Sequence, residues 1–67
     1  PKDAGAYYER GLVRAQMGEK QKAIQDFQLA AKLRLEQGST QGFKDAQYHI
    51  KRLQQTLSPT KNGLTTQ

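Results

Sequence analysis

The chain has 67 residues, a formal net charge of +5 and only 34% hydrophobic residues. A chain of this length forms one small domain, which buries only about 60% of the surface that the unfolded chain exposes. No apolar run approaches the ~20 residues that a membrane span needs, so no membrane insertion is predicted. The chain has no Cys and one His, so neither a disulfide nor a metal site is expected. A reducing, cytoplasmic location fits this composition.

The first predicted helix covers residues 4–17. Asp3 stands just before it, where a carboxylate can accept hydrogen bonds from the free N–H groups of the first turn. Gly18 follows it, and glycine closes a helix in the left-handed conformation without steric cost. The two residues therefore predict both ends of this helix.

The second predicted helix covers residues 20–36. Its apolar residues recur at spacings of three and four, which is the period of one face of a helix. Two alanines widen this stripe and would let a neighbouring helix approach closely. The stripe consists of Ile24, Phe27, Ala31 and Leu35, and the widening residues are Ala23 and Ala30.

The third predicted helix covers residues 40–57, and either Ser39 or Thr40 could cap it. Pro59 cannot continue a helix, so the helix ends before it. The polar segment 58–67 is typical of a disordered tail. No stretch alternates with the period of a strand, and an all-α fold is therefore predicted. The apolar stripe of this helix is formed by Phe43, Ala46, Ile50, Leu53 and Leu57.

The first two helices together resemble a tetratricopeptide repeat (TPR), a helix–turn–helix unit of about 34 residues with small and aromatic residues at fixed offsets. Small residues lie where the two helices cross, and large rings fill the space beside the crossing. The resemblance covers residues 1–37 and implies one TPR motif. The matching residues are Tyr7, Gly11, Gly18, Ala23, Phe27 and Ala30.

The resemblance also implies an α-solenoid fragment. Pro1 matches the proline that closes a preceding repeat, which indicates the C-terminal piece of a longer TPR protein. Gln41 and Gly42 stand where a new repeat would have an aromatic pair. Residues 38–57 are therefore similar to the solvating helix that caps a TPR array. Arg10, Arg14 and Leu35 depart from the family pattern.

TPR proteins bind partner proteins or peptides, so the resemblance implies a protein–protein interaction scaffold with no catalysis and no cofactor. In the family, one side of each first helix lines the groove that holds the partner. An alternative remains open, in which the same residues pack on a preceding repeat or on the third helix. The residues that match the groove side are Tyr8, Leu12, Ala15 and Gln16.

Two further functions are weighed against this one. The first is self-association, for which Leu29 and Leu33 form a candidate patch unless the third helix covers them. The second is nucleic-acid binding through a basic face around one tyrosine of the third helix, although a capping helix is charged in any case. This basic face consists of Lys44, Tyr48, Lys51 and Arg52.

One structural contact is also predicted. Asp26 lies one residue before Phe27, at a height that should face Arg10 of the first helix. An Arg10–Asp26 ion pair would hold the two helices in register. His49 lies at the edge of the apolar stripe of its helix, and a half-buried structural role is expected for it.

Overall fold

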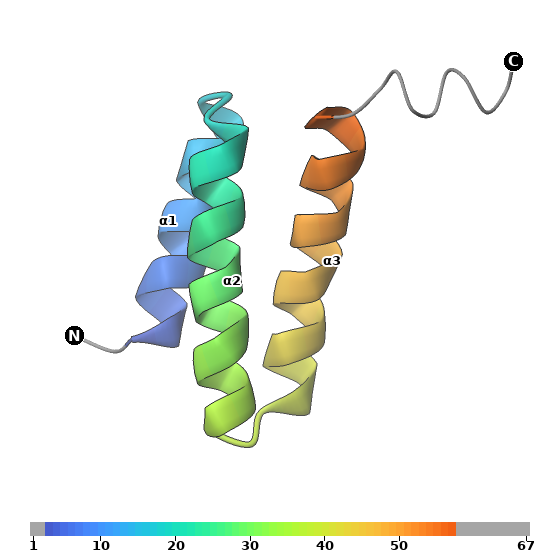
Figure 1. Ribbon diagram of the computed structural model, residues 1–67. Helices are drawn as coiled ribbons and strands as arrows, with labels where there is room; N and C mark the ends of the chain where they lie inside the picture. Colours follow the sequence, from blue (N-terminus) through green and yellow to red (C-terminus); the bar gives the residue numbers. More distant parts are fainter. Residues whose placement is uncertain (1–2, 58–67) are drawn as a thin grey trace, which may run out of the picture.

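The computed structural model describes residues 3–57, which form three helices (Figure 1). Helix α1 spans Ala4–Gln16, α2 spans Lys20–Glu36 and α3 spans Thr40–Leu57. These bounds agree with the predicted ranges to within one residue. The described part of the chain contains no strand, so the predicted all-α class is confirmed. The predicted tail and the proposed role of Pro1 lie outside the described residues.

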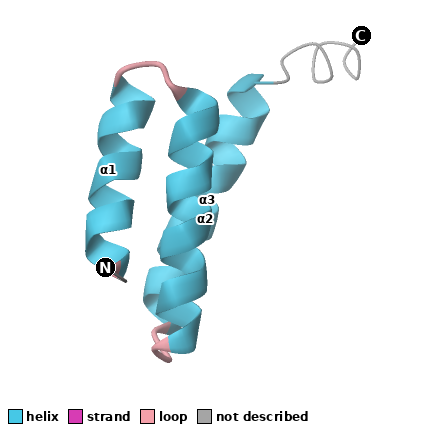
Figure 2. Cartoon of the chain, turned by 60° about the vertical axis from the view of Figure 1, so that its left-hand side comes forward, coloured by secondary structure: helices cyan, strands magenta, loops and turns pink. Residues whose placement is uncertain are grey.

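The helices begin and end at the capping residues that the sequence predicted. The Asp3 carboxylate accepts hydrogen bonds from the N–H groups of Gly5 and Ala6, at 3.0 and 3.3 Å. Gly18 and Gly38 have φ values of 83° and 79°, in the left-handed region, where a side chain would be strained. Each glycine lies in one of the two short loops of Figure 2. At the start of α3, the Ser39 hydroxyl accepts from the Gly42 N–H at 3.2 Å, so Ser39 is the cap.

Helix α2 is the central element of the fold. Both α1 and α3 pack along it and make little contact with each other, as the ribbon in Figure 1 shows. The central helix therefore supplies most of the core. The buried apolar residues are Ala4 of α1, Ala46 and Ile50 of α3, and Ala23, Ile24, Phe27, Ala30 and Ala31 of α2.

The side chain of Phe27 lies at the centre of this core and is completely buried. Its ring stacks on the His49 ring of α3, with centroids 4.9 Å apart and planes inclined by 12°. The Tyr8 ring of α1 meets it edge-on at 5.5 Å. One aromatic side chain of α2 thus contacts both α1 and α3. His49 is half-buried, as expected, and its ring is part of the core packing.

Gly11 allows α1 to lie close to the Phe27 ring. A Cβ atom at this position would come within 2.9–3.1 Å of three atoms of that ring, which neighbouring rings hold in place. We expect Gly11→Ala to destabilise the fold by about 1–2 kcal/mol, because overpacking outweighs the better helix propensity of Ala. Thermal unfolding followed by circular dichroism measures this change.

Gly5→Ala is the matched control for Gly11→Ala. It lies in the same helix, and its new Cβ would make only ordinary contacts, the nearest at 3.4 Å. We expect this variant to be as stable as the parent chain or slightly more stable. Equal stability of the two alanine variants would contradict the close approach at Gly11.

Two residues of the predicted apolar stripes are exposed, while Phe43 and Leu53 are half-buried. Leu35 is 58% exposed and Leu57 is 40% exposed. Leu35 lies in the last turn of α2, where α3 begins with small and polar residues that cannot cover it. Leu57 ends α3 beside the start of α2, where the first residue is Lys20. Helical period alone therefore overstates the core at both ends of the α2–α3 pair.

Candidate functional site

The α1–α2 hairpin contains a buried carboxylate held by two arginines. Asp26 of α2 is 1% exposed. Arg10 of α1 donates to both of its oxygens, with Nε–Oδ2 at 3.0 Å and Nη2–Oδ1 at 2.9 Å. The ion pair that was expected between these two residues is therefore present. Arg14 donates from Nη1 to Oδ2 at 3.1 Å and is a third member that was not anticipated.

Arg14 could have been found from the sequence, because it follows Arg10 by one helical turn and faces the same side. The hydrogen bond and the negative charge of Asp26 raise the pKa of Arg10 above its usual value. Two guanidinium groups share one carboxylate, so the cluster carries one excess positive charge. Because half of the Arg10 side chain is exposed, that charge is accessible from outside.

The residues that match the groove side of α1 lie along the space between α1 and α3. Tyr8, Leu12 and Ala15 are half-buried and pack against the core, together with Leu53 of α3. We call these four residues the inner strip. Gln16 is exposed at the end of α1. The side chains of the inner strip therefore pack against the core and also keep part of their surface exposed. The sequence alone left both arrangements open.

The Tyr8 ring reaches α3 as well as the core. It meets the His49 ring edge-on, with centroids 5.5 Å apart, and His49 in turn meets the Tyr48 ring at 5.4 Å. These rings connect α1 to α3, which otherwise have little contact. This contact could not be predicted from the sequence, because it depends on how α3 lies against the hairpin.

Leu29 and Leu33 lie on the side of the hairpin away from α3. Together with Tyr7 of α1 and with Lys32 and Glu36 they line an open hollow of about 150 Å³. Leu29 is 42% exposed. Of the two alternatives for these leucines, cover by α3 is wrong, because they point away from the α3-facing residues Ile24 and Ala31. We call Tyr7, Leu29 and Leu33 the outer patch.

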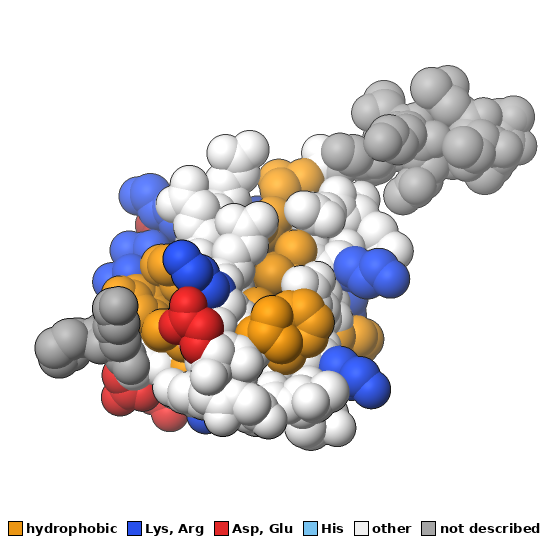
Figure 3. Space-filling view, turned by 60° about the horizontal axis from the view of Figure 1, so that its bottom comes forward, with side chains coloured by type: hydrophobic (Ala, Val, Ile, Leu, Met, Phe, Trp, Pro, Cys, Tyr) orange, Lys and Arg blue, Asp and Glu red, His pale blue; other side chains and the backbone are white. Residues whose placement is uncertain are grey.

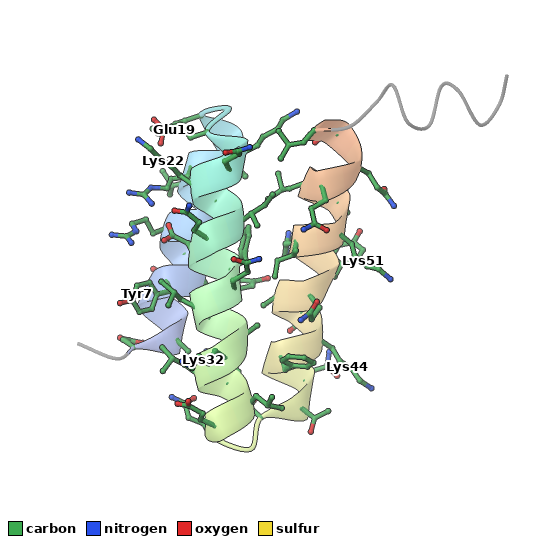
Figure 4. The ribbon with its side chains drawn as sticks, in the orientation of Figure 1. Tyr7, Glu19, Lys22, Lys32, Lys44 and Lys51 are labelled. Atoms are coloured by element: carbon green, nitrogen blue, oxygen red, sulfur yellow. The ribbon has the colours of Figure 1, made fainter. Side chains whose placement is uncertain are left out.

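Charged residues follow two separate edges of the molecule. Figure 4 shows Glu19, Lys22, Tyr7 and Lys32 along the α1–α2 side, and Lys44 and Lys51 on α3 at the opposite side. In the space-filling view of Figure 3, hydrophobic side chains reach the surface between polar and charged groups. On this face, polar and charged groups therefore divide the apolar surface.

The predicted basic face of α3 is exposed. Tyr48 is 56% exposed, and Lys44, Lys51 and Arg52 are also exposed. However, Arg52 donates to the Tyr48 hydroxyl at 3.2 Å, and its guanidinium carbon lies 5.7 Å from the ring centroid. One face of the only aromatic ring in this group is thus already in contact with a cation, which weakens the case for base stacking.

The described residues hold no group of three His, Asp or Glu side chains that could bind a metal ion. None of the three helices is both long enough and apolar enough to cross a membrane. Comparison with protein-family models, with curated proteins and with solved structures found no match to this chain.

Proposed function

We propose that this chain is a protein–protein interaction module of the TPR type, which binds a segment of a partner protein along the inner strip and catalyses no reaction. The observation that supports this function is the arrangement of the three helices. Both α1 and α3 pack on α2 and have little contact with each other, and Tyr8, Leu12 and Leu53 keep part of their surface exposed.

The inner strip has the chemistry of a peptide-binding surface. Its aromatic and aliphatic side chains are held by the core beneath them, so little conformational entropy is lost when a partner binds. Tyrosine is also among the residues that contribute most to binding at interfaces. The exposed Gln16 side chain at one end of the strip can form hydrogen bonds with a partner.

Selection of short peptides from a random displayed library against the folded chain tests this proposal. We expect apolar peptides to be enriched, and their binding to shift the backbone amide NMR signals of α1 and α3 that border the inner strip. Leu12→Lys should weaken the binding by about tenfold or more, because a charge replaces an apolar contact.

Leu29→Gln is the matched control for this experiment, since Leu29 lies on the other side of the hairpin. It should leave the affinity for the selected peptides unchanged. The proposal fails if no peptide is enriched. It also fails if the selected peptides bind equally well to the parent chain and to a Leu12→Lys variant whose circular dichroism shows it to be folded.

A second candidate function is self-association, and the exposed Leu29 of the outer patch favours it. An apolar surface that no described part of the chain covers can be buried by another copy. This candidate uses a different surface from the inner strip, so the two functions are compatible within one molecule.

A further inference from the structure

Arg34 of α2 lies at the end of the inner strip that is nearest the α2–α3 loop. Its Nη2 atom lies 3.8 Å from the position that a Cβ atom of Gly5 would occupy in α1. Its Cγ and Cδ atoms lie 2.9 and 2.8 Å from the corresponding position at Gly42 in α3. The half-buried side chain therefore reaches from α3 toward α1, and at both points it has a glycine beside it.

Helical spacing places this arginine on the same surface as the inner strip. In α1, Gly5 precedes Tyr8 by three residues, which is about one turn. In α3, Gly42 precedes His49 by seven residues, which is about two turns. The arginine itself follows Phe27 in α2 by seven residues. Each of the three helices thus leads from the cluster of aromatic rings to the guanidinium group.

The Arg34 guanidinium has no partner among residues 3–57. The hydrogen bonds that arginine side chains donate in this part of the chain come from Arg10, Arg14 and Arg52. The ion pairs there involve Arg10 and Arg14. No fully buried side-chain nitrogen there lacks a hydrogen bond, so the N–H donors of Arg34 reach the surface. They are therefore open to a ligand.

We propose that the partner segment of the inner strip carries an Asp or Glu side chain that pairs with Arg34, an inference that rests on the proposed function. A guanidinium group binds a carboxylate through two parallel hydrogen bonds, which is one of the strongest contacts that an arginine forms. The partner thus combines apolar residues for Tyr8, Leu12 and Leu53 with one acidic residue. The net charge of +5 also attracts an acidic partner at longer range.

The geometry also sets the spacing between the acidic and the apolar residues of the partner. Gly5, beside the guanidinium group, precedes Leu12 by seven residues, which is about 10.5 Å along α1. An extended segment covers that distance in about three residues. We therefore expect the acidic residue about three positions from the apolar residue that contacts Leu12.

Other charged residues border the same surface. Asp3, Glu9 and Asp45 are within about one turn of the two glycines, but all three are exposed and none pairs with the guanidinium group. Water screens their repulsion, whereas a carboxylate in direct contact with a half-buried guanidinium group is screened less. Lys20 and Arg52 lie toward the other end of the strip and also favour an acidic partner.

The displayed peptide library tests this inference together with variants of the peptide and of the chain. The selected peptides should carry Asp or Glu about three positions from an apolar residue. Replacement of that acid by its amide should weaken binding by about tenfold or more, and Arg34→Gln should weaken binding of the acidic peptide equally. The Arg34→Gln chain should then bind the acidic and the amide peptide equally well, because the pair is already broken.

Lys51→Gln is the matched control, because it removes the same charge from the opposite side of the molecule, as Figure 4 shows. It should leave the affinity unchanged. Circular dichroism shows whether Arg34→Gln is folded, and the amide peptide tests the contact without changing the chain. Apolar peptides without an acid, or an amide peptide that binds as tightly as the acidic one, would overturn this inference and leave the proposed function standing. A library without any enriched peptide would overturn both.

Discussion

Phe27→Ala is expected to leave most of the chain unfolded at room temperature. The ring is completely buried and contacts aromatic side chains of both other helices. Removal of a buried Phe costs about 3–5 kcal/mol through lost burial and the cavity that remains. A chain of 67 residues has a total stability of only about 3–10 kcal/mol, so this loss is comparable to the whole.

The helical signal in circular dichroism and its urea dependence measure this effect. Leu35→Ala is the matched control, since it shortens a leucine of the same helix that is mostly exposed. We expect the control to lose less than about 1 kcal/mol, as is usual for surface positions. A Phe27→Ala chain with the unfolding midpoint of the parent would show that the three helices do not share this core.

Asp26→Asn is expected to destabilise the hairpin by about 3 kcal/mol, at the lower end of the range for breaking a buried ion pair. The carboxylate accepts three hydrogen bonds from two arginines. The neutral amide cannot replace it, so the two positive charges face each other without a counter-charge. Both guanidinium groups retain some contact with water, which limits the loss.

Urea unfolding of two further variants tests this explanation. Asp45→Asn changes an exposed aspartate that accepts a hydrogen bond from Gln41, and it should alter the stability by less than about 0.5 kcal/mol. Combined replacement of Asp26 by Leu and of Arg10 and Arg14 by Met should recover much of the loss, because apolar groups of similar size often replace a buried ion pair without cost. If this combined variant is unstable while the Asp26→Asn chain is as stable as the parent, packing rather than charge determines the stability at this site.

The local sequence determined the helices and their ends. Asp3, Gly18 and Ser39 act on neighbouring residues only, so their effect could be predicted without knowing the fold. The helical period also identified the buried faces of α2 and α3 around Phe27 and Ile50. The Arg10–Asp26 contact was predictable because a tight turn joins two antiparallel helices and leaves little freedom in their register.

Only the tertiary structure decided which candidate surfaces are open. The sequence could not place α3 relative to the two sides of the hairpin, because both sides carry leucines at helical spacing. Packing of α3 on Ile24, Phe27 and Ala31 left the outer patch uncovered and brought His49 into contact with both Phe27 and Tyr8. Leu35 and Leu57 stayed exposed because burial needs an apolar partner at the same height on the facing helix. A repeating pattern along one helix carries no information about that partner.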